Sequence, residues 1–357
     1  MKQVKLGKLL LIGIFILAMF GQLPYQTVES ITPTNSDMIL NDDASRLSDI
    51  KVLAIIGNQF GDAYFWVKDQ FESWGCNYTT VGLCALCSSC PHKPQRPVTP
   101  ELLIGDVTDE ILLQFDAVYV PPGAHWISLL VNTQVKNLLS NAYNLGLIVS
   151  GICIGTKIIA AANDLVAGAK VAFYSESSTE MQAAGATVLF GSSVVSDKRI
   201  VTATTGTCGS TNPYIYQFCV AIAKEVKGYS AVLSSSIEPQ ENSKNNYTLV
   251  VTTTDLTNIF YGNTSTEIAS VKAILTWSKG STETSLTLTE GSSSDTFTGN
   301  FTKLEKGKYS IELEVRSYGY GVEVVRDEVS FKVSLSGLFL GAIIVGWLGL
   351  IYYRKDS

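Results

Sequence analysis

Short apolar segments alternate with segments of helical periodicity from Ile50 onward, and this alternation restricts the fold more than any other feature of the sequence. The segment "KVLAIIG" is apolar and β-branched. The segment "DAYFWVKDQFESWG" after it has helical spacing, with Asp62 as the predicted N-cap and Gly75 at its end. The same order returns in "DAVYVPPG", "ISLLVNTQVKNLLSNAYNLG" and "LIVSG". Strands that are apolar on both faces and separated by helices predict a parallel sheet covered by helices on both sides.

The alternation continues to about Gly228. The segments "KVAFY", "TVLF" and "RIVTATT" are predicted strands, and "SSTEMQAAG" and the stretch from Pro213 to Val226 are predicted helices. We therefore expect residues 50–228 to form one α/β domain.

The pattern changes at Tyr229. From there to about Lys332, polar and apolar residues alternate in segments such as "YTLVVTTT", "SVKAILTWS" and "YSIELEVRS". Short strands at this spacing predict an all-β, immunoglobulin-like β-sandwich over residues 229–332, with Trp277 in its core. This part shows no catalytic pattern, so we expect it to be a spacer or an adhesion module.

The amino end of the chain has the composition of an export signal. Lys2, Lys5 and Lys8 precede the uncharged run "LLLIGIFILAMFG", so residues 1–22 are predicted to be a signal peptide or an uncleaved signal anchor. Residues 23–49 are rich in Thr, Ser, Asn and Asp and lack periodicity, which is typical of a linker.

The carboxyl end has the composition of a membrane span. Residues 333–353 carry no charge, and about 20 apolar residues suffice to cross a bilayer, so this stretch is predicted to be a transmembrane helix. Arg354 and Lys355 place the tail, residues 354–357, in the cytoplasm and the main body outside the cell membrane. Gly337 and Gly341 form a GxxxG pair of the kind that packs helix dimers, so a homodimer is one expected partner arrangement.

The composition fits an exported protein and argues against a nucleic-acid partner. The net charge is −6, so the chain lacks the basic surface that phosphates require. Glycosylation motifs begin at Asn77, Asn246, Asn263 and Asn300, which predicts a glycoprotein.

Cys153 lies between a predicted strand and a predicted helix, in "IVSGICIGTK". A nucleophile on such a turn lies beside backbone N–H groups and the helix dipole, which favour its anion. Cysteine benefits most, because a helix N-terminus lowers the pKa of a thiol toward neutrality. Gly151 and Gly155 flank it, as a tight turn requires. The alternative interpretation is a small buried core cysteine.

With its surroundings, this segment resembles the ThiJ/PfpI family of the class I glutamine amidotransferase-like superfamily, over roughly residues 51–228. The resemblance rests on "KVLAIIGNQFGDAYF", "FDAVYVPPGAHW", "GICIGTKIIAAANDLVAGAKV" and "FYSESSTEMQAAGATV". It implies a flavodoxin-like sheet with the nucleophile at Cys153. It also implies an oxyanion-binding loop at Gly123 and Ala124, with Ile154 as a further donor. Tyr174 matches a tyrosine near the nucleophile in some members.

Two positions depart from the family pattern. Members usually carry a glutamate at the end of the first strand, where this chain has Gly61 followed by Asp62. Peptidase-like members have a histidine directly after the cysteine, where this chain has Ile154. His125 is a candidate base for Cys153, and Asp62 is a candidate acid. The alternatives are a histidine that only packs or caps and an aspartate that only caps its helix.

A second cysteine is expected near the nucleophile. Cys208, in "TTGTCGSTNP", lies on a later loop that in this fold converges on Cys153. A disulfide between the two would make the site redox-sensitive or inactive. Cys219, in the last predicted helix, is expected in the core.

A cysteine cluster occupies residues 76–97, which look inserted relative to the family pattern. It comprises Cys76, Cys84, Cys87, Cys90 and His92. Three interpretations compete: paired disulfides, a zinc site of four cysteines or of three cysteines with the histidine, and an iron–sulfur ligand set. Export to an oxidising exterior favours disulfides first and zinc second. No other cofactor is expected.

Together these features predict a membrane-anchored protein, outside the cytoplasm, that carries a ThiJ/PfpI-like domain. The resemblance implies cysteine-dependent chemistry on a small-molecule or peptide substrate, either as a hydrolase or as a glyoxalase-like lyase acting on small aldehydes. The alternative is a degenerate binding module, or a redox or stress sensor, that keeps the fold without turnover.

Overall fold

The structure is a computed structural model, and it describes residues 47–91, 95–204, 214–240, 246–254, 267–278, 283–291, 295–302, 304, 307–318 and 321–331. The predicted signal segment 1–22, most of the linker, the predicted transmembrane segment 333–353 and the tail lie outside these residues, as do His92 and Cys208. Within the described part of the chain, no helix is both long and apolar enough to span a membrane.

A parallel sheet forms the centre of the first half of the chain, which confirms the predicted α/β fold. Its strands lie in the order β10-β11-β7-β6-β1-β2-β5, and all neighbours are parallel except β10 and β11. The strands are β1 (Lys51–Ile56), β2 (Asn77–Gly82), β5 (Leu102–Leu103), β6 (Ala117–Val120), β7 (Ile148–Ile152), β10 (Val194–Asp197) and β11 (Ile200–Ala203).

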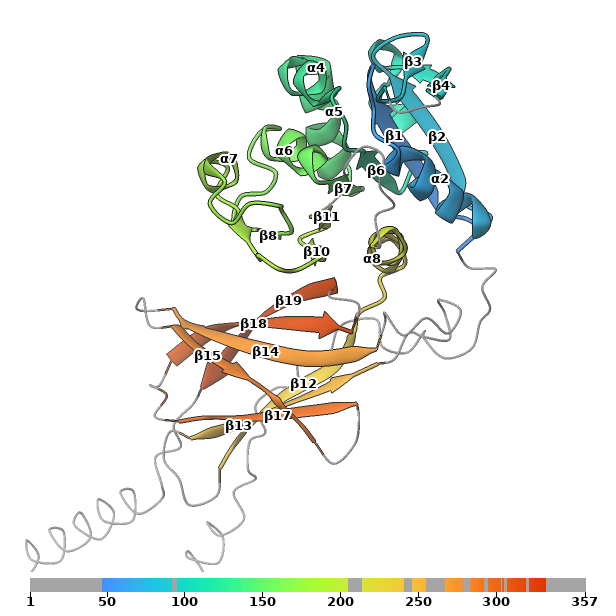
Figure 1. Ribbon diagram of the computed structural model, residues 1–357. Coiled ribbons are helices and arrows are strands. Elements are labelled where there is room, and N and C mark those ends of the chain that lie inside the picture. Colours follow the sequence, from blue (N-terminus) through green and yellow to red (C-terminus); the bar gives the residue numbers. More distant parts are fainter. Residues whose placement is uncertain are drawn as a thin grey trace, which may run out of the picture.

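Helices cover both faces of this sheet (Figure 1). On one face lie α2 (Ala63–Ser73) and α8 (Ile215–Lys227), and on the other lie α4 (Trp126–Val131), α5 (Thr133–Asn144) and α6 (Ile154–Ala160). Strand β1 shows why both layers form: Val52 and Ala54 pack into the first layer, and Leu53 and Ile55 into the second. An apolar strand with a side-chain period of two buries both of its faces in this way.

The long helix predicted over "ISLLVNTQVKNLLSNAYNLG" is in fact two helices. Asn132 has extended backbone angles between α4 and α5, and its side-chain oxygen accepts hydrogen bonds from Gln134 N at 2.8 Å and Val135 N at 3.2 Å. This is an N-cap, which favours a helix start over helix continuation. The prediction of one continuous helix is therefore wrong.

Two strand assignments also change. The first part of the predicted insertion 76–97 is β2, which pairs in parallel with β1 and belongs to the central sheet. Only the segment after Gly82 is therefore an addition to the central sheet. The predicted strand "KVAFY" contributes only β8 (Lys170–Val171), which pairs with β9 (Thr187–Val188) in a separate two-stranded sheet. The shorter helices are α3 (Asp109–Leu112), α7 (Thr179–Ala183) and the 3₁₀ turn η3 (Ile104–Asp106).

The second half of the chain is β-rich, and two layers of strands face each other across a shared apolar core. One layer contains β12 (Val232–Pro239), β13 (Tyr247–Thr253), β16 (Thr289–Glu290) and β17 (Thr296–Phe301). The other contains β14 (Ile268–Trp277), β15 (Glu283–Thr287), β18 (Gly307–Ser317) and β19 (Gly321–Phe331). Trp277, predicted inside this core, is only partly buried at its margin, beside Tyr309.

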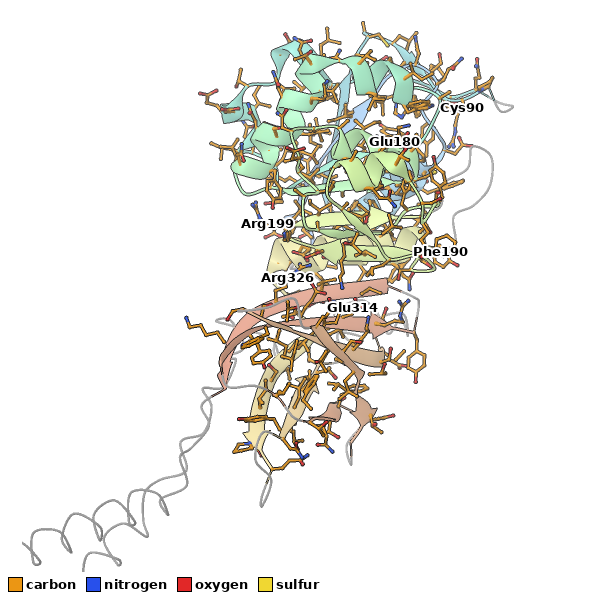
Figure 2. The ribbon with its side chains drawn as sticks, turned by 90° about the vertical axis from the view of Figure 1, so that its left-hand side faces the viewer. Cys90, Glu180, Phe190, Arg199, Glu314 and Arg326 are labelled. Carbon is orange, nitrogen blue, oxygen red and sulfur yellow. The ribbon has the colours of Figure 1, made fainter. Side chains whose placement is uncertain are left out.

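The two halves share one continuous sheet, because β19 pairs in parallel with β10. Charged side chains bridge the same junction. Asp197, whose side chain is fully buried, pairs with Arg326, and Arg326 also contacts Glu312 at 2.7 Å. Lys170 pairs with both Glu312 and Glu314. Figure 2 shows Glu314 and Arg326 where the halves meet and Cys90 toward the far end of the α/β half.

Candidate functional site

Cys153 occupies a strained turn between β7 and α6. Its backbone angles are φ 53° and ψ −117°, a combination that a residue with a Cβ atom rarely adopts. The surrounding chain holds it there, since Cys153 N donates to Ala203 O at 2.7 Å and Thr156 N donates to Cys153 O at 3.0 Å. The partly buried side chain packs against the α2 and α8 layer. This is the geometry of a nucleophile on a strand-to-helix elbow.

The elbow rests directly on the end of β6. A Cβ atom added to Gly155 would lie 2.2 Å from the carbonyl oxygen of Val120 and 3.5 Å from that of Pro121. Only glycine permits this approach, because real Cβ atoms do not come within 3 Å of backbone atoms. The first turn of α6 is thereby fixed against the loop that follows β6.

The predicted oxyanion loop is that same loop. Gly123 has φ +141°, and a Cβ atom on it would lie 2.4 Å from Gly61 N, so glycine is required there too. Gly61 N donates to Pro122 O at 2.7 Å, and Phe60 forms a bridge with Gly123. Ala124 is the next residue in the loop. Ile154 is the first residue of α6, where backbone N–H groups have no partner within the helix.

His125 follows this loop, and both of its ring nitrogens form hydrogen bonds with the backbone. The side chain is 2% exposed; its Nδ1 accepts a hydrogen bond from Gly57 N at 3.0 Å, and its Nε2 donates to Pro121 O at 2.9 Å. Burial lowers the pKa of His125 to about 4, although the contacts with Pro121 and Pro122 oppose the shift. Neither ring nitrogen is available to accept a proton from Cys153, so the base role does not fit this arrangement. Its position instead fits the packing alternative.

Asp62 is bound to a different partner from the one predicted. It stands at the N-cap position of α2, but its side chain makes no capping hydrogen bond. Its Oδ1 accepts from Arg96 Nη2 at 3.1 Å, and the Arg96 guanidinium lies 3.5 Å from the centre of the Phe65 ring. Asp62 therefore joins α2 to the cysteine-rich segment. These contacts support neither the predicted role of Asp62 as an acid nor its predicted role as a side-chain cap.

The remaining predicted positions near the nucleophile are occupied as follows. A Cβ atom at Gly61 would lie 2.8 Å from Pro122 O, so this backbone has no room for the family's glutamate at that position. Tyr174 is 52% exposed, and its ring packs against Phe173 with centroids 4.2 Å apart. The predicted partner Cys208 lies outside the described residues.

The cysteine-rich segment does not gather its four cysteines. Cys76 precedes β2 and donates to Leu47 O at 2.9 Å, whereas Cys84 and Cys87 follow the six residues of β2, about 20 Å farther along. A four-cysteine zinc site is therefore wrong for this geometry. Cys84 Sγ and Cys87 Sγ lie 2.8 Å apart as thiols, and Cys90 Sγ donates to Gln59 O at 3.1 Å.

The structure supports neither the metal nor the paired disulfides at this segment. Among the described residues, no group of three or more His, Cys, Asp or Glu side chains is placed to hold a metal ion, and His92 is outside that set. None of Cys76, Cys84 and Cys87 forms a disulfide. Their different hydrogen-bond partners explain why the predicted pairing of all four does not arise.

Sequence reasoning assigned no role to Arg96 or Ala203. Arg96 neutralises Asp62 from 34 positions away, and Ala203 O holds the Cys153 backbone from the neighbouring strand. No local sequence pattern marks either contact. For Ala203 the sequence gives only an indirect indication. Ala203 belongs to the predicted strand "RIVTATT", and a strand of the parallel sheet must pair with a neighbour, which here is the strand before Cys153.

Two comparisons with known proteins give matches, and both matches fall on the first half of the chain. A family model described as the DJ-1/PfpI family matches residues 50–225. A comparison with curated proteins gives no match.

Several solved structures are similar to this half. One is a ThiJ/PfpI domain protein from Brachyspira murdochii, at 23% identity and a TM-score of 0.44, covering 51% of this chain and 99% of that one. Another is DJ-1β from Drosophila melanogaster, at 18% identity and a TM-score of 0.39, covering 51% and 95%. A third is DJ-1 from Schizosaccharomyces pombe, at 13% identity and a TM-score of 0.41, covering 51% and 92%.

Proposed function

Because residues 50–225 of this chain form a DJ-1/PfpI family domain, we propose that the chain uses Cys153 as the nucleophile of a site that handles small aldehydes. The observation that carries the proposal is the backbone of Cys153, which is held at φ 53° by hydrogen bonds on both sides. Such strain persists where the surrounding structure fixes a residue for a task. Here the task is to present a thiol beside the loop that contains Gly123.

Aldehydes suit this site because thiol addition needs few catalytic groups. The Cys153 thiolate forms a bond to the aldehyde carbon, and the carbonyl π electrons move to the oxygen. Backbone N–H groups in the positions of Gly123, Ala124 and Ile154 would stabilise that oxygen until it takes a proton from water. The product is a hemithioacetal, and the step is reversible and expels no leaving group.

The alternative activity, that of a hydrolase, requires more catalytic groups. It needs a base to activate water and an acid to protonate the leaving group. Among the described residues around the elbow, His125 has both nitrogens hydrogen-bonded, Asp62 pairs with Arg96, and Gly61 carries no side chain. The addition of an aldehyde to Cys153 needs neither group, so this step is the better match.

A second candidate function follows from the same contacts. If no group moves a proton after the adduct forms, the domain binds electrophiles covalently without turnover, as a sensing or binding module would. The engagement of His125 by Gly57 and Pro121 favours this candidate.

One experiment separates the candidates. The reduced full-length chain is incubated with a small 2-oxoaldehyde, and both the 2-hydroxy acid and any covalent adduct are measured. In turnover the hemithioacetal would isomerise to a thioester as one proton moves from C1 to C2, and water would then cleave the thioester to the 2-hydroxy acid and the free Cys153 thiol. Hydroxy acid formation that Cys153→Ser abolishes supports the enzyme, and an adduct on Cys153 without turnover supports the sensing module. The matched control is Cys76→Ser, because its hydroxyl can still donate to Leu47 O. If neither product nor adduct forms, both candidates fail.

We also propose that the domain is displayed outside a cell membrane on a single carboxyl-terminal span. The support is the uncharged run 333–353 with Arg354 and Lys355 after it, and the basic and apolar residues 1–22. The β-rich half would serve as an immunoglobulin-like spacer. Its sheet continues into β10 of the α/β half, so the two halves would be presented as one body.

Limited proteolysis of intact cells tests this placement. Added protease is expected to remove both halves and leave a small fragment that ends in "RKDS". Recovery of the full-length chain from the soluble cytoplasmic fraction would contradict the membrane proposal and leave the chemistry of Cys153 unaffected.

A further inference from the structure

Two thiols outside the candidate site lie in direct contact. Cys84 Sγ and Cys87 Sγ are 2.8 Å apart, and the sulfurs of a disulfide are about 2.05 Å apart, so the two sulfurs are within about 1 Å of bonding distance. They belong to the sequence Cys84-Ala-Leu-Cys87, which has the C-x-x-C spacing found in dithiol redox sites. The contact is between reduced thiols here.

The backbone on each side of the pair is fixed, which maintains this contact. Leu83 N, next to Cys84, donates to Ile56 O at the end of β1 at 3.0 Å. Cys87 begins β3 (Cys87–Ser88), which pairs with β4 (Pro97–Val98). Ser88 O also accepts from Gln59 N at 2.7 Å. Closing the bond therefore requires side-chain rotation and little backbone movement.

The two thiols differ in solvent exposure, and from this difference we infer which of them reacts first. Cys84 is partly exposed, and the bend at Ala85 and Leu86 beside it faces solvent, with Leu86 58% exposed. Cys87 is fully buried behind it, and burial, with the contact to Cys84, raises the pKa of the Cys87 thiol, so it is the less reactive of the two at neutral pH. Cys84 is the thiol that an incoming molecule can reach.

The other two cysteines of the segment donate hydrogen bonds to backbone carbonyl oxygens. Cys90 Sγ donates to Gln59 O at 3.1 Å, and Cys76 Sγ donates to Leu47 O at the opposite end of β2. The S–S contact therefore singles out one pair among them.

We propose that Cys84 and Cys87 form a redox-active dithiol–disulfide pair that exchanges with low-molecular-weight disulfides. In the first step the Cys84 thiolate attacks the external disulfide, whose S–S bond breaks, and one external thiolate leaves and takes a proton. In the second step Cys87 loses its proton, attacks the Cys84 sulfur and releases the second external thiol. The protein pair loses two electrons and two protons, and the external disulfide gains them as two thiols.

The pair lies beside the candidate site but does not depend on it. Cys90 N donates to Phe60 O at 2.7 Å, and Phe60 bridges both Ser89 and Gly123. The segment that carries the pair is therefore bonded to the strand end that also supports the oxyanion loop. The exchange chemistry itself involves neither Cys153 nor His125.

The test equilibrates the full-length chain in buffers that span a wide range of reduced to oxidised glutathione. Each sample is quenched by alkylation, cleaved after Leu83 and Leu86 by a chymotrypsin-like protease, and analysed by tandem mass spectrometry without reduction. We expect a bond between Cys84 and Cys87 whose fraction rises from under about a tenth to over about nine tenths as the squared concentration of reduced glutathione divided by that of oxidised glutathione falls by about a hundredfold, as a single two-electron couple requires.

Variants identify the order of reaction. Cys87→Ser is expected to trap glutathione on Cys84 as a mixed disulfide, whereas in Cys84→Ser the buried Cys87 stays unmodified. Cys90→Ser is the matched control and should keep the exchange. The proposal is overturned if the wild-type pair stays a dithiol at every ratio, stays a disulfide at every ratio, or if Cys84 bonds to Cys90 instead.

Discussion

The backbone of Gly155 packs against Val120: a Cβ atom on residue 155 would come within 2.2 Å of the Val120 carbonyl oxygen. This contact joins the first turn of α6 to the end of β6, and so joins the chain just after Cys153 to the start of the predicted oxyanion loop. The geometry of the candidate site depends on it, because both sides of the contact are backbone and neither can turn away.

We predict that Gly155→Ala destabilises the protein by about 2 kcal/mol or more, since overpacking against fixed atoms forces the backbone apart. The substitution should also slow alkylation of Cys153, because a shift of the backbone at residue 155 displaces the turn that holds Cys153. Gly105→Ala is the matched control: its Cβ would meet only the Gln134 side chain, at 3.6 Å. Denaturant unfolding of both variants checks the prediction, and equal stability of the two would contradict it.

His125 gives the fold a defined pH dependence. Burial lowers its pKa to about 4 in the folded state, whereas an ordinary histidine titrates near 6.5. The unfolded chain therefore binds a proton first as the pH falls. The stabilisation is fully present above about pH 6.5 and is lost as the pH falls toward 4, which amounts to about 2 kcal/mol between pH 7.5 and pH 5.

The measurement compares unfolding free energies of wild type and His125→Gln at pH 7.5 and pH 5. The variant is expected to be less stable at pH 7.5 and to lose about 2 kcal/mol less on acidification. His92→Gln, which replaces the other histidine of the chain, should keep the wild-type difference. Parallel pH profiles for wild type and His125→Gln would show that His125 is not the titrating group.

The junction between the halves should depend on Arg326. The Arg326 guanidinium pairs with the fully buried carboxylate of Asp197. Burial lowers the pKa of Arg326, but the interactions with Asp197 and Glu312 outweigh burial and raise it. Among the described residues, Arg326→Met would leave the Asp197 carboxylate with a single hydrogen-bond donor, the backbone N–H of Lys170 at 2.6 Å. We predict a loss of about 2 to 3 kcal/mol in the free energy of unfolding, because an uncompensated buried charge remains.

Lys272→Met provides the matched control for that prediction. Lys272 lies 3.7 Å from Glu314, and its side chain is 43% exposed, so its loss should cost less than about 1 kcal/mol. Both variants are compared by denaturant titration at neutral pH. Similar losses for the two variants would mean that the Asp197 contact is no more important than a surface ion pair.

The α/β fold could be predicted because its signals are local. The run from Val52 to Ile56 is apolar on both faces, which only a strand between two helical layers satisfies. Cys153 stood out for a similar reason, since a strand, a cysteine between glycines and a helix follow one another directly in the chain. Patterns of this kind require no knowledge of distant partners.

The details that the sequence did not reveal all depend on distant or competing contacts. The ring nitrogens of His125 are bonded to Gly57 and Pro121, and Asp62 is bonded to Arg96. Likewise, β10 and β19 pair across more than a hundred residues. Asn132 is the exception, because its capping contact is local, but it competes with an apolar pattern that runs through it.

The most direct test of the account is the alkylation rate of each cysteine in the fully reduced protein at pH 7. Backbone N–H groups and the start of α6 favour the Cys153 thiolate, so Cys153 is expected to react at least about tenfold faster than Cys84, the other partly exposed cysteine among those that the structure describes. Quantitative mass spectrometry of the labelled peptides gives each rate, and Cys153→Ser should remove the fast phase. A Cys153 that reacts no faster than Cys84 would contradict the claim that the elbow presents an activated nucleophile.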